Sequence, residues 1–148
     1  MEIRALDGSH RSAAVALWER TGLTRPWNPP AADFDRAVAG PTSIVLGGFE
    51  GSELVATAMV GHDGHRGWAY YLCVDPDLRH RGAGRAMMDA ATGWLRGVGV
   101  SKVQLMVRSD NTAALGFYDA LGFATEEVTV RSRWLAGGPP GPGTTHPS

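Results

Sequence analysis

The sequence predicts an α+β domain with one mixed β-sheet. Two adjacent stretches, about 43–49 and 53–61, are rich in apolar and β-branched residues and are separated by a short glycine-containing turn, which is typical of a β-hairpin. Two later stretches, 84–95 and 111–121, place apolar side chains at helical spacing. Strands that precede and separate such helices predict a sheet flanked by helices.

The N-terminal part is expected to contain one strand, two helices and a stiff loop. Residues 2–6 can form a first strand, and Ser9 is a plausible N-cap for a helix that ends near Gly22. The three prolines within residues 25–30 remove backbone donors and disfavour regular helix, so this segment is expected to be a loop. A short helix is then expected over residues 31–38.

The C-terminal half is expected to alternate strands and helices. Residues 68–74 form a nearly continuous apolar run, as in a central strand that is buried on both faces. Residues 102–107 alternate as a further strand after the helix that begins near Gly84. Asn111 can cap the next helix. A final extended stretch is expected over residues 123–134.

Length and composition indicate one domain followed by a tail. A chain of 148 residues with 43% hydrophobic residues can bury one core and is too short for two ordinary domains. Residues 136–148 carry no large apolar side chain that could offset the entropy of ordering them. We therefore expect the domain at residues 1–135 and a disordered Gly/Pro-rich tail at residues 136–148.

Charge and cysteine content exclude several classes of function. The formal net charge of −1 gives no basic excess that would attract nucleic acid or an anionic membrane. A single cysteine excludes an internal disulfide and a structural zinc site of several thiolates, and the histidines lack a neighbouring carboxylate cluster, so no metal site is expected. The chain shows neither a signal peptide nor a membrane span. A soluble, cytoplasmic protein is expected.

The strongest chemical signal lies between the apolar strand of residues 68–74 and the following helix. The segment here reads Arg79-His80-Arg81-Gly82-Ala83-Gly84-Arg85. The free N–H groups and the dipole of a helix N-terminus favour an anion, and glycines let a phosphate approach the backbone closely. No Lys-Ser or Lys-Thr follows, as a P-loop requires, and Met87 replaces the third glycine of a dinucleotide fingerprint. A pyrophosphate bound without catalytic magnesium is therefore expected.

Two motifs carry a resemblance to a known family. Arg79, Gly82 and Gly84 match the pattern R/Q-x-x-G-x-G/A after a V-x-P strand end, and residues 111–123 follow N-x-x-A-x-x-F/L-Y-x-x-x-G-F. On these residues the chain resembles the GCN5-related N-acetyltransferases (the GNAT family) over about residues 2–134. The segment D-G-H-R-G-x-A-Y-Y-L further resembles the YpeA-like subgroup.

The resemblance implies a fold and a cofactor. The fold is a single GNAT-type domain whose mixed central sheet splays between the fourth and fifth strands, and the cosubstrate is acetyl-coenzyme A, used without a metal. Backbone groups of the central strand would pair with the pantetheine arm, and the glycine turn would hold the pyrophosphate. The implied cofactor-binding residues are Leu72, Cys73, Val74, Arg79, His80, Arg81, Gly82, Ala83, Gly84, Arg85, Asn111 and Tyr118.

The implied reaction is direct attack of a neutral primary amine on the thioester. It requires a base for the ammonium, a donor for the oxyanion and an acid for the departing thiolate. Tyr118 matches the usual general acid of the family, and a backbone N–H near Cys73 would stabilise the oxyanion. Some members carry a glutamate where this chain has Trp68. The candidates for the base are therefore Glu19 and the turn residues Asp63 and His65.

The acceptor is open at this point. Members of the family acetylate both small-molecule amines and protein or peptide amines, and the protein can be a monomer or a homodimer. Side chains that can line an acceptor pocket are Trp27, Arg25, Arg66, Trp68 and Tyr70, although such aromatics can also belong to the core. Two alternatives to an enzyme stay open, namely a non-catalytic acyl-coenzyme A sensor and a partner-bound interaction module.

Overall fold

The computed structural model describes residues 1–79 and 81–139. These residues form two compact units. The first unit contains residues 1–24 and 29–105, and the second contains residues 25–28 and the described residues from 106 onward.

The first unit is built on a five-stranded sheet with the strand order β1-β2-β3-β4-β5. The first four strands pair antiparallel with their neighbours in sequence, and the fifth pairs parallel with the fourth. The predicted α+β class with a mixed sheet is therefore confirmed. The strands are β1 (Glu2–Ala5), β2 (Ser43–Glu50), β3 (Glu53–His62), β4 (Gly67–Val74) and β5 (Val103–Gln104).

The sheet splays between β4 and β5, as predicted. The two strands pair only where Gly67 lies opposite Val103 and Trp68 opposite Gln104, whereas β4 continues to Val74. The strand predicted over residues 102–107 is consequently too long, because an alternating pattern forms a ladder only where a partner strand lies beside it. The divergence leaves the C-terminal half of β4 without a β5 neighbour.

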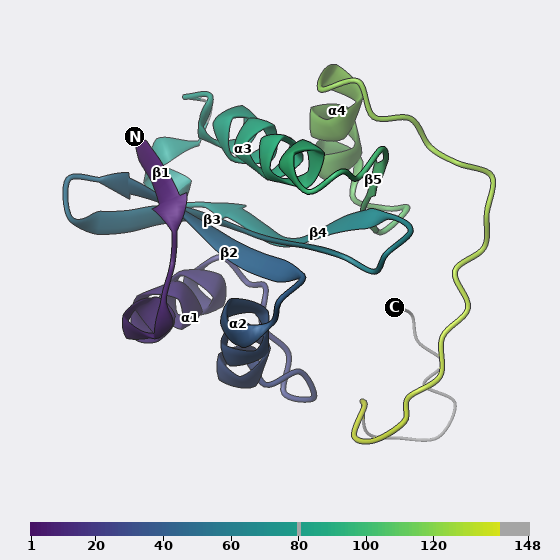
Figure 1. Ribbon diagram of the computed structural model, residues 1–148, viewed down its shortest axis with the longest axis horizontal. Helices are drawn as coiled ribbons and strands as arrows, with labels where there is room; N and C mark the ends of the chain where they lie inside the picture. Colours follow the sequence, from purple (N-terminus) through teal and green to yellow (C-terminus); the bar gives the residue numbers. More distant parts are fainter. Residues whose placement is uncertain (80, 140–148) are drawn as a thin grey trace. The chain divides into compact units, whose positions relative to one another are not determined.

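Helices cover both faces of this sheet (Figure 1). Helices α1 (Arg11–Arg20) and α2 (Pro30–Ala39) pack on one face, and α3 (Ala83–Gly97) packs on the other. Two apolar clusters lie between the layers. The first gathers around Trp18, Phe34 and Val45, and the second gathers around Met87 and Leu95.

The predicted N-cap at Ser9 is wrong. Asp7 caps a single 3-10 turn, η1 (Gly8–His10), and its Oδ1 accepts a hydrogen bond from the Ser9 N–H at 2.9 Å. The backbone N–H of Asp7 donates to His10 Nδ1 at 3.1 Å, which completes a capping box. Since the Ser9 hydroxyl also donates to Asp7, it is not available to cap a helix of its own, and α1 begins only at Arg11.

Burial of β4 departs from the prediction of a strand covered on both faces. Ala69 and Cys73 are buried, but Tyr70 is 44% exposed. The reason is that β5 flanks only the start of β4 and that the register between β3 and β4 shifts in the middle of the strand. The apolar run therefore indicated a central strand but not its exposure.

The second unit contains α4 (Thr112–Ala120), which Asn111 caps as predicted. Asn28 donates its N–H to the Arg25 carbonyl at 3.0 Å, so residues 25–28 form a turn as expected of the proline-rich loop. Residues 123–139 have no helix or strand, and Val128, Val130 and Leu135 are exposed. Of the predicted disordered tail, residues 140–148 lie outside the described residues, and the domain boundary stays a prediction. Within the described ranges, no helix is long and apolar enough to cross a membrane.

Candidate active site

A buried carboxylate fixes the chain where β4 ends. Asp75 is 8% exposed, its N–H donates to the Val55 carbonyl at 2.7 Å, and its Oδ1 accepts from the Asp77 N–H at 3.0 Å. Its Oδ2 accepts from Arg20 Nη2 at 2.8 Å, which ties the end of α1 to this point. A 3-10 turn, η2 (Pro76–Leu78), follows directly. Sequence analysis missed this role, although Asp before Pro after a strand is a turn signal that could have revealed it.

The N-terminus of α3 has the features of an anion site. Gly82 is the N-cap in the left-handed conformation, with φ 79°, and no side chain caps the helix. The N–H groups of the first turn, including those of Ala83 and Gly84, have no partner within the helix. The first turn contains no acidic residue, so nothing there opposes the positive end of the helix dipole. A Cβ at Gly82 would meet no atom within 4 Å, so the backbone conformation and not crowding requires glycine here.

Arginines flank this turn. Arg79, Arg81 and Arg85 are exposed, as expected of side chains that contact a soluble anion. His80, the other predicted member of the turn, lies outside the described residues. The predicted phosphate segment thus joins an uncapped helix N-terminus to three cationic side chains.

A β-bulge interrupts β4 at the start of the predicted pantetheine-binding segment of residues 72–74. Thr57 pairs with Cys73 and Met59 with Tyr70, so Tyr71 and Leu72 together lie opposite Ala58. Tyr71 has φ 51° and is the sole non-glycine residue with a positive φ in the described chain. Bulges and strained backbone recur next to active sites, where they break the ladder and redirect backbone groups. No sequence signal predicted this bulge, because it depends on the register with β3.

A polar network surrounds the bulge. Trp18 stacks on the Tyr71 ring with centroids 3.9 Å apart, and its Nε1 donates to Thr57 Oγ1 at 2.8 Å. The Thr57 hydroxyl donates to the Tyr71 carbonyl at 2.8 Å, and Tyr71 donates its own hydroxyl to Asp33 Oδ2 at 2.9 Å. Cys73 Sγ lies 3.2 Å from Thr57 Oγ1. Burial raises the pKa of the Cys73 thiol, which disfavours the thiolate form that a cysteine nucleophile requires.

The candidate base Asp63 is engaged in the turn between β3 and β4. Its Oδ1 accepts from the N–H groups of His65 and Arg66 at 2.9 and 2.8 Å, and its Oδ2 accepts from Trp68 Nε1 at 3.1 Å. These hydrogen bonds, led by that from Arg66, lower the pKa of Asp63 to about 2. A carboxylate with so low a proton affinity is a weak base. Its three hydrogen bonds fix the turn and the orientation of the Trp68 ring.

The remaining candidates of the first unit lie at two places. Arg66, Trp68 and Tyr70 follow the turn at Asp63, and burial raises the pKa of Tyr70, with the Asp63 charge as a second cause. Glu19 is exposed near the end of α1. The turn therefore brings four candidates together, namely Asp63, Arg66, Trp68 and Tyr70. Glu19 lies in a different element, α1, far from them in sequence.

Four candidates belong to the second unit. Asn111 accepts from the Ala114 N–H at 3.1 Å through its side chain and caps α4. The ring of Tyr118 packs edge-on against Phe117 and Phe123, with centroids 5.0 and 5.4 Å away. Burial raises the pKa of the Tyr118 phenol, which therefore stays protonated at neutral pH. Arg25 and Trp27 lie in the turn of residues 25–28, and their approach to β4, like that of Tyr118, stays a prediction.

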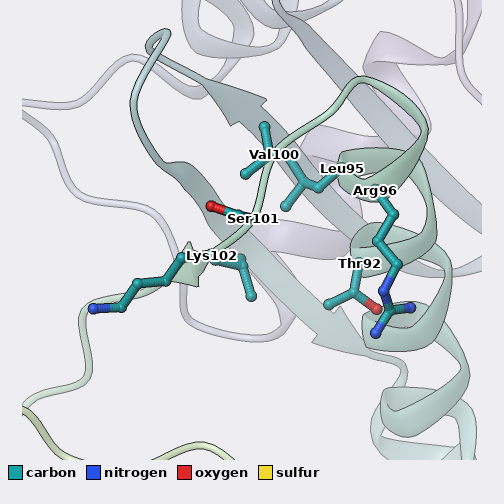
Figure 2. A pocket seen from close by; sticks show the side chains of 7 residues that line it. Thr92, Leu95, Arg96, Val100, Ser101 and Lys102 are labelled. Carbon is teal, nitrogen blue, oxygen red and sulfur yellow. The ribbon is translucent and has the colours of Figure 1, made fainter.

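A small pocket of about 100 Å³ lies elsewhere in the first unit (Figure 2). It lies between the C-terminal half of α3 and the segment that leads into β5, far along the helix from Gly82. Arg96 extends alongside Thr92, whereas Lys102 points away from the hollow. None of the predicted cofactor residues lines it; the lining residues are Thr92, Leu95, Arg96, Val100, Ser101, Lys102 and Val103. Across the described residues, no group of three or more His, Cys, Asp or Glu side chains is placed to hold a metal ion.

Comparison with known proteins shows the family and the fold of this chain. Residues 10–123 match the acetyltransferase (GNAT) family. Acetyltransferase ECA0875 of Pectobacterium atrosepticum is 42% identical over 91% of this chain and 96% of its own length, and acetyltransferase YE1169 of Yersinia enterocolitica is 37% identical over the same shares. The structure of AAC(6')-Iy with a coenzyme A bisubstrate analogue superposes with a TM-score of 0.79 at 17% identity, over 91% of this chain and 98% of that one.

Proposed function

Because the chain belongs to the acetyltransferase (GNAT) family, we propose that it transfers the acetyl group of acetyl-coenzyme A to a primary amine. The observation that carries this proposal is the junction between β4 and α3. There a bulged strand that lacks a β5 neighbour along its C-terminal half leads through a turn fixed by Asp75 to an uncapped helix N-terminus. Acetyl-coenzyme A has an elongated arm for the strand and, beyond that arm, a pyrophosphate for the helix N-terminus.

The cofactor would bind along this junction. The pyrophosphate would accept hydrogen bonds from the first N–H groups of α3, with charge supplied by Arg79, Arg81 and Arg85. The pantetheine arm carries amide groups that would pair with backbone groups of Leu72, Cys73 and Val74, where β5 has diverged. This binding mode needs no cation from the solvent.

The chemistry would proceed by direct attack. The amine nitrogen bonds to the thioester carbon, the carbonyl oxygen becomes an oxyanion, and a backbone N–H of the bulge near Cys73 donates to it. The C–S bond then breaks, and the thiolate takes its proton from the Tyr118 hydroxyl. The protonated phenol of Tyr118 supports this role, which also requires that α4 approach β4.

Glu19 is a better candidate for the base than Asp63. The amine must lose a proton before or during attack, and Asp63 holds protons too weakly to accept it near neutral pH. Glu19 is exposed and can accept the proton directly or through water. The removed proton then passes to the solvent.

The acceptor would be a small-molecule amine or a peptide amine. AAC(6')-Iy is an aminoglycoside N-acetyltransferase, so this fold can accept a bulky polar amine. Here the aromatic side chains of Trp68 and Tyr70, together with Trp27, Arg25 and Arg66, would define what fits. A cytoplasmic location and a monomeric or homodimeric state complete the proposal.

A non-catalytic acyl-coenzyme A sensor is the second candidate. The observation that favours it concerns the base: β4 contains no carboxylate, and the candidate base Asp63 is committed to its turn. Such a protein would bind the cofactor but would turn over no amine.

Titration calorimetry with acetyl-coenzyme A tests the proposal first, with desulfo-coenzyme A and ATP as controls, followed by thiol release over a panel of amines. We expect binding that is selective for the coenzyme and amine-dependent release of thiol. Binding without release for any amine would support the sensor. Absence of binding would reject both functions and favour an interaction module.

A further inference from the structure

The backbone of Tyr71 is held in a conformation that residues other than glycine rarely adopt. Its φ of 51° lies in the left-handed region, where the Cβ atom crowds the following carbonyl. A bulky residue stays there only where its surroundings fix it. The contacts of Tyr71 must therefore do so.

Three elements hold Tyr71 at three different points. Trp18 of α1 stacks on its ring, with an angle of 16° between the ring planes. Asp33 of α2 accepts from its hydroxyl at 2.9 Å, and Thr57 of β3 donates to its carbonyl at 2.8 Å. The ring, the hydroxyl and the carbonyl are thus all restrained, and the backbone between them has little freedom to rotate.

The Thr57 hydroxyl already uses both its proton and its oxygen in hydrogen bonds. Thr57 and Trp18 are each 0% exposed. A hydroxyl has one proton, which Thr57 gives to the Tyr71 carbonyl, so its oxygen accepts from Trp18 Nε1 and faces the Cys73 thiol. Loss of this hydroxyl would leave a buried N–H and a buried C=O without their partner, and both would be free to move.

We propose that Trp18, Asp33 and Thr57 are positioning residues of the acetyltransferase reaction. By holding Tyr71 in the left-handed conformation, they aim a backbone N–H of the bulge at the thioester oxygen of acetyl-coenzyme A. The proposal rests on the proposed function. Its physical basis is that an oxyanion donor acts only within hydrogen-bond reach of the developing charge, so a displacement of about 1 Å costs roughly 100-fold in rate.

Glycine and alanine at position 71 separate the backbone effect from the loss of the ring. Both Tyr71→Gly and Tyr71→Ala remove every side-chain contact, but glycine adopts a positive φ without steric cost and alanine does not. We expect kcat of Tyr71→Gly to exceed that of Tyr71→Ala by about tenfold, with the same KM for acetyl-coenzyme A. The control is Val45, a buried strand residue of the same apolar cluster with no positive φ, where glycine should be no better than alanine. Equal kcat for the two Tyr71 variants would overturn the proposal.

Thr57 gives a second test that avoids a large cavity. Thr57→Val keeps the shape and removes the hydroxyl, whereas Thr57→Ser keeps the hydroxyl. We expect Thr57→Val to lower kcat about tenfold with little change in calorimetric affinity for acetyl-coenzyme A, and Thr57→Ser to restore most of the loss. The infrared stretch of a 13C-labelled acetyl carbonyl should lie at lower frequency on the wild-type protein than in water, and this shift should shrink in Thr57→Val only.

The failures of the two proposals are distinguishable. If the wild-type protein binds acetyl-coenzyme A and acetylates an amine, but Thr57→Val keeps both kcat and the infrared shift, the positioning role is overturned and the proposed function stands. If the wild-type protein binds no acetyl-coenzyme A, both are overturned.

Discussion

Burial raises the pKa of the Tyr118 phenol above its ordinary value, and this gives a prediction about proton transfer. Tyr118→Phe keeps the ring and its contacts with Phe117 and Phe123 but removes the proton. We expect kcat to fall about 100-fold, as for loss of a general acid, and the calorimetric affinity for acetyl-coenzyme A to stay nearly unchanged. An unchanged single-turnover rate with a slow amine would remove the acid role. Because the raised pKa keeps the acid form present, wild-type kcat should show no loss from this group below about pH 10.

Asp63 provides a prediction for stability against pH. Its hydrogen bonds lower its pKa to about 2 in the folded protein, below the value of about 3.9 in an unfolded chain. A carboxylate with a lowered folded pKa stabilises the fold above its unfolded pKa and loses this contribution as the pH falls through its folded pKa. Asp63→Asn should therefore lower Tm at neutral pH, and the difference from wild type should shrink between about pH 4 and pH 2. Differential scanning calorimetry across this range measures it.

The same variant distinguishes a turn residue from a base. If Asp63 only holds the turn, Asp63→Asn should leave most of kcat in place, whereas Glu19→Gln should lower kcat strongly. The opposite result would make Asp63 the base despite its low proton affinity.

At the scale of elements, a negative charge at the N-terminus of α3 should have opposite effects on two quantities. It should raise the stability of the fold and lower the affinity for coenzyme A. A negative side chain in the first turn stabilises a helix by about 0.3–1 kcal/mol, and replacing glycine within a helix adds about 1 kcal/mol. Gly84→Glu should therefore raise Tm while it lowers the affinity for coenzyme A by at least about tenfold, by repelling the pyrophosphate. Gly84→Gln is the matched control, of similar size without the charge, and should weaken binding less. Equal binding by both variants in calorimetry would move the phosphate away from this turn.

The sequence predicted α3 well, but it did not predict the bulge in β4. The order of strands, the helix after the glycine turn and the Asn111 cap follow from local patterns that repeat at 2 or 3.6 residues or from a side chain that caps its own helix. The left-handed Tyr71 and the pairing of Arg20 with Asp75 depend on which residues meet across elements. Thr57 carried a faint signal, as a polar residue within an otherwise apolar strand.

At the scale of the whole molecule, sequence and structure differ in what they say of the C-terminal segment. The extended stretch predicted over residues 123–134 has no ladder, because the described residues offer it no partner strand. The alternation of Val128 and Val130 with polar residues is compatible with a strand but does not create one. Local patterns thus predict strands more reliably inside a hairpin, where the partner is next in sequence, as for β2 and β3.

The last prediction concerns the boundary at residue 135. If residues 136–148 form a tail that packs against no core, a chain that ends at Leu135 should match the full chain in Tm. Removal of such a tail exposes no buried surface. A cofactor that binds only the folded state at 100 times its Kd stabilises that state by about 2.7 kcal/mol, and both chains should show the same rise in Tm when acetyl-coenzyme A is added. An equal Tm with a smaller rise for the shortened chain would instead assign the tail to cofactor binding, and a lower Tm without cofactor would place it within the domain.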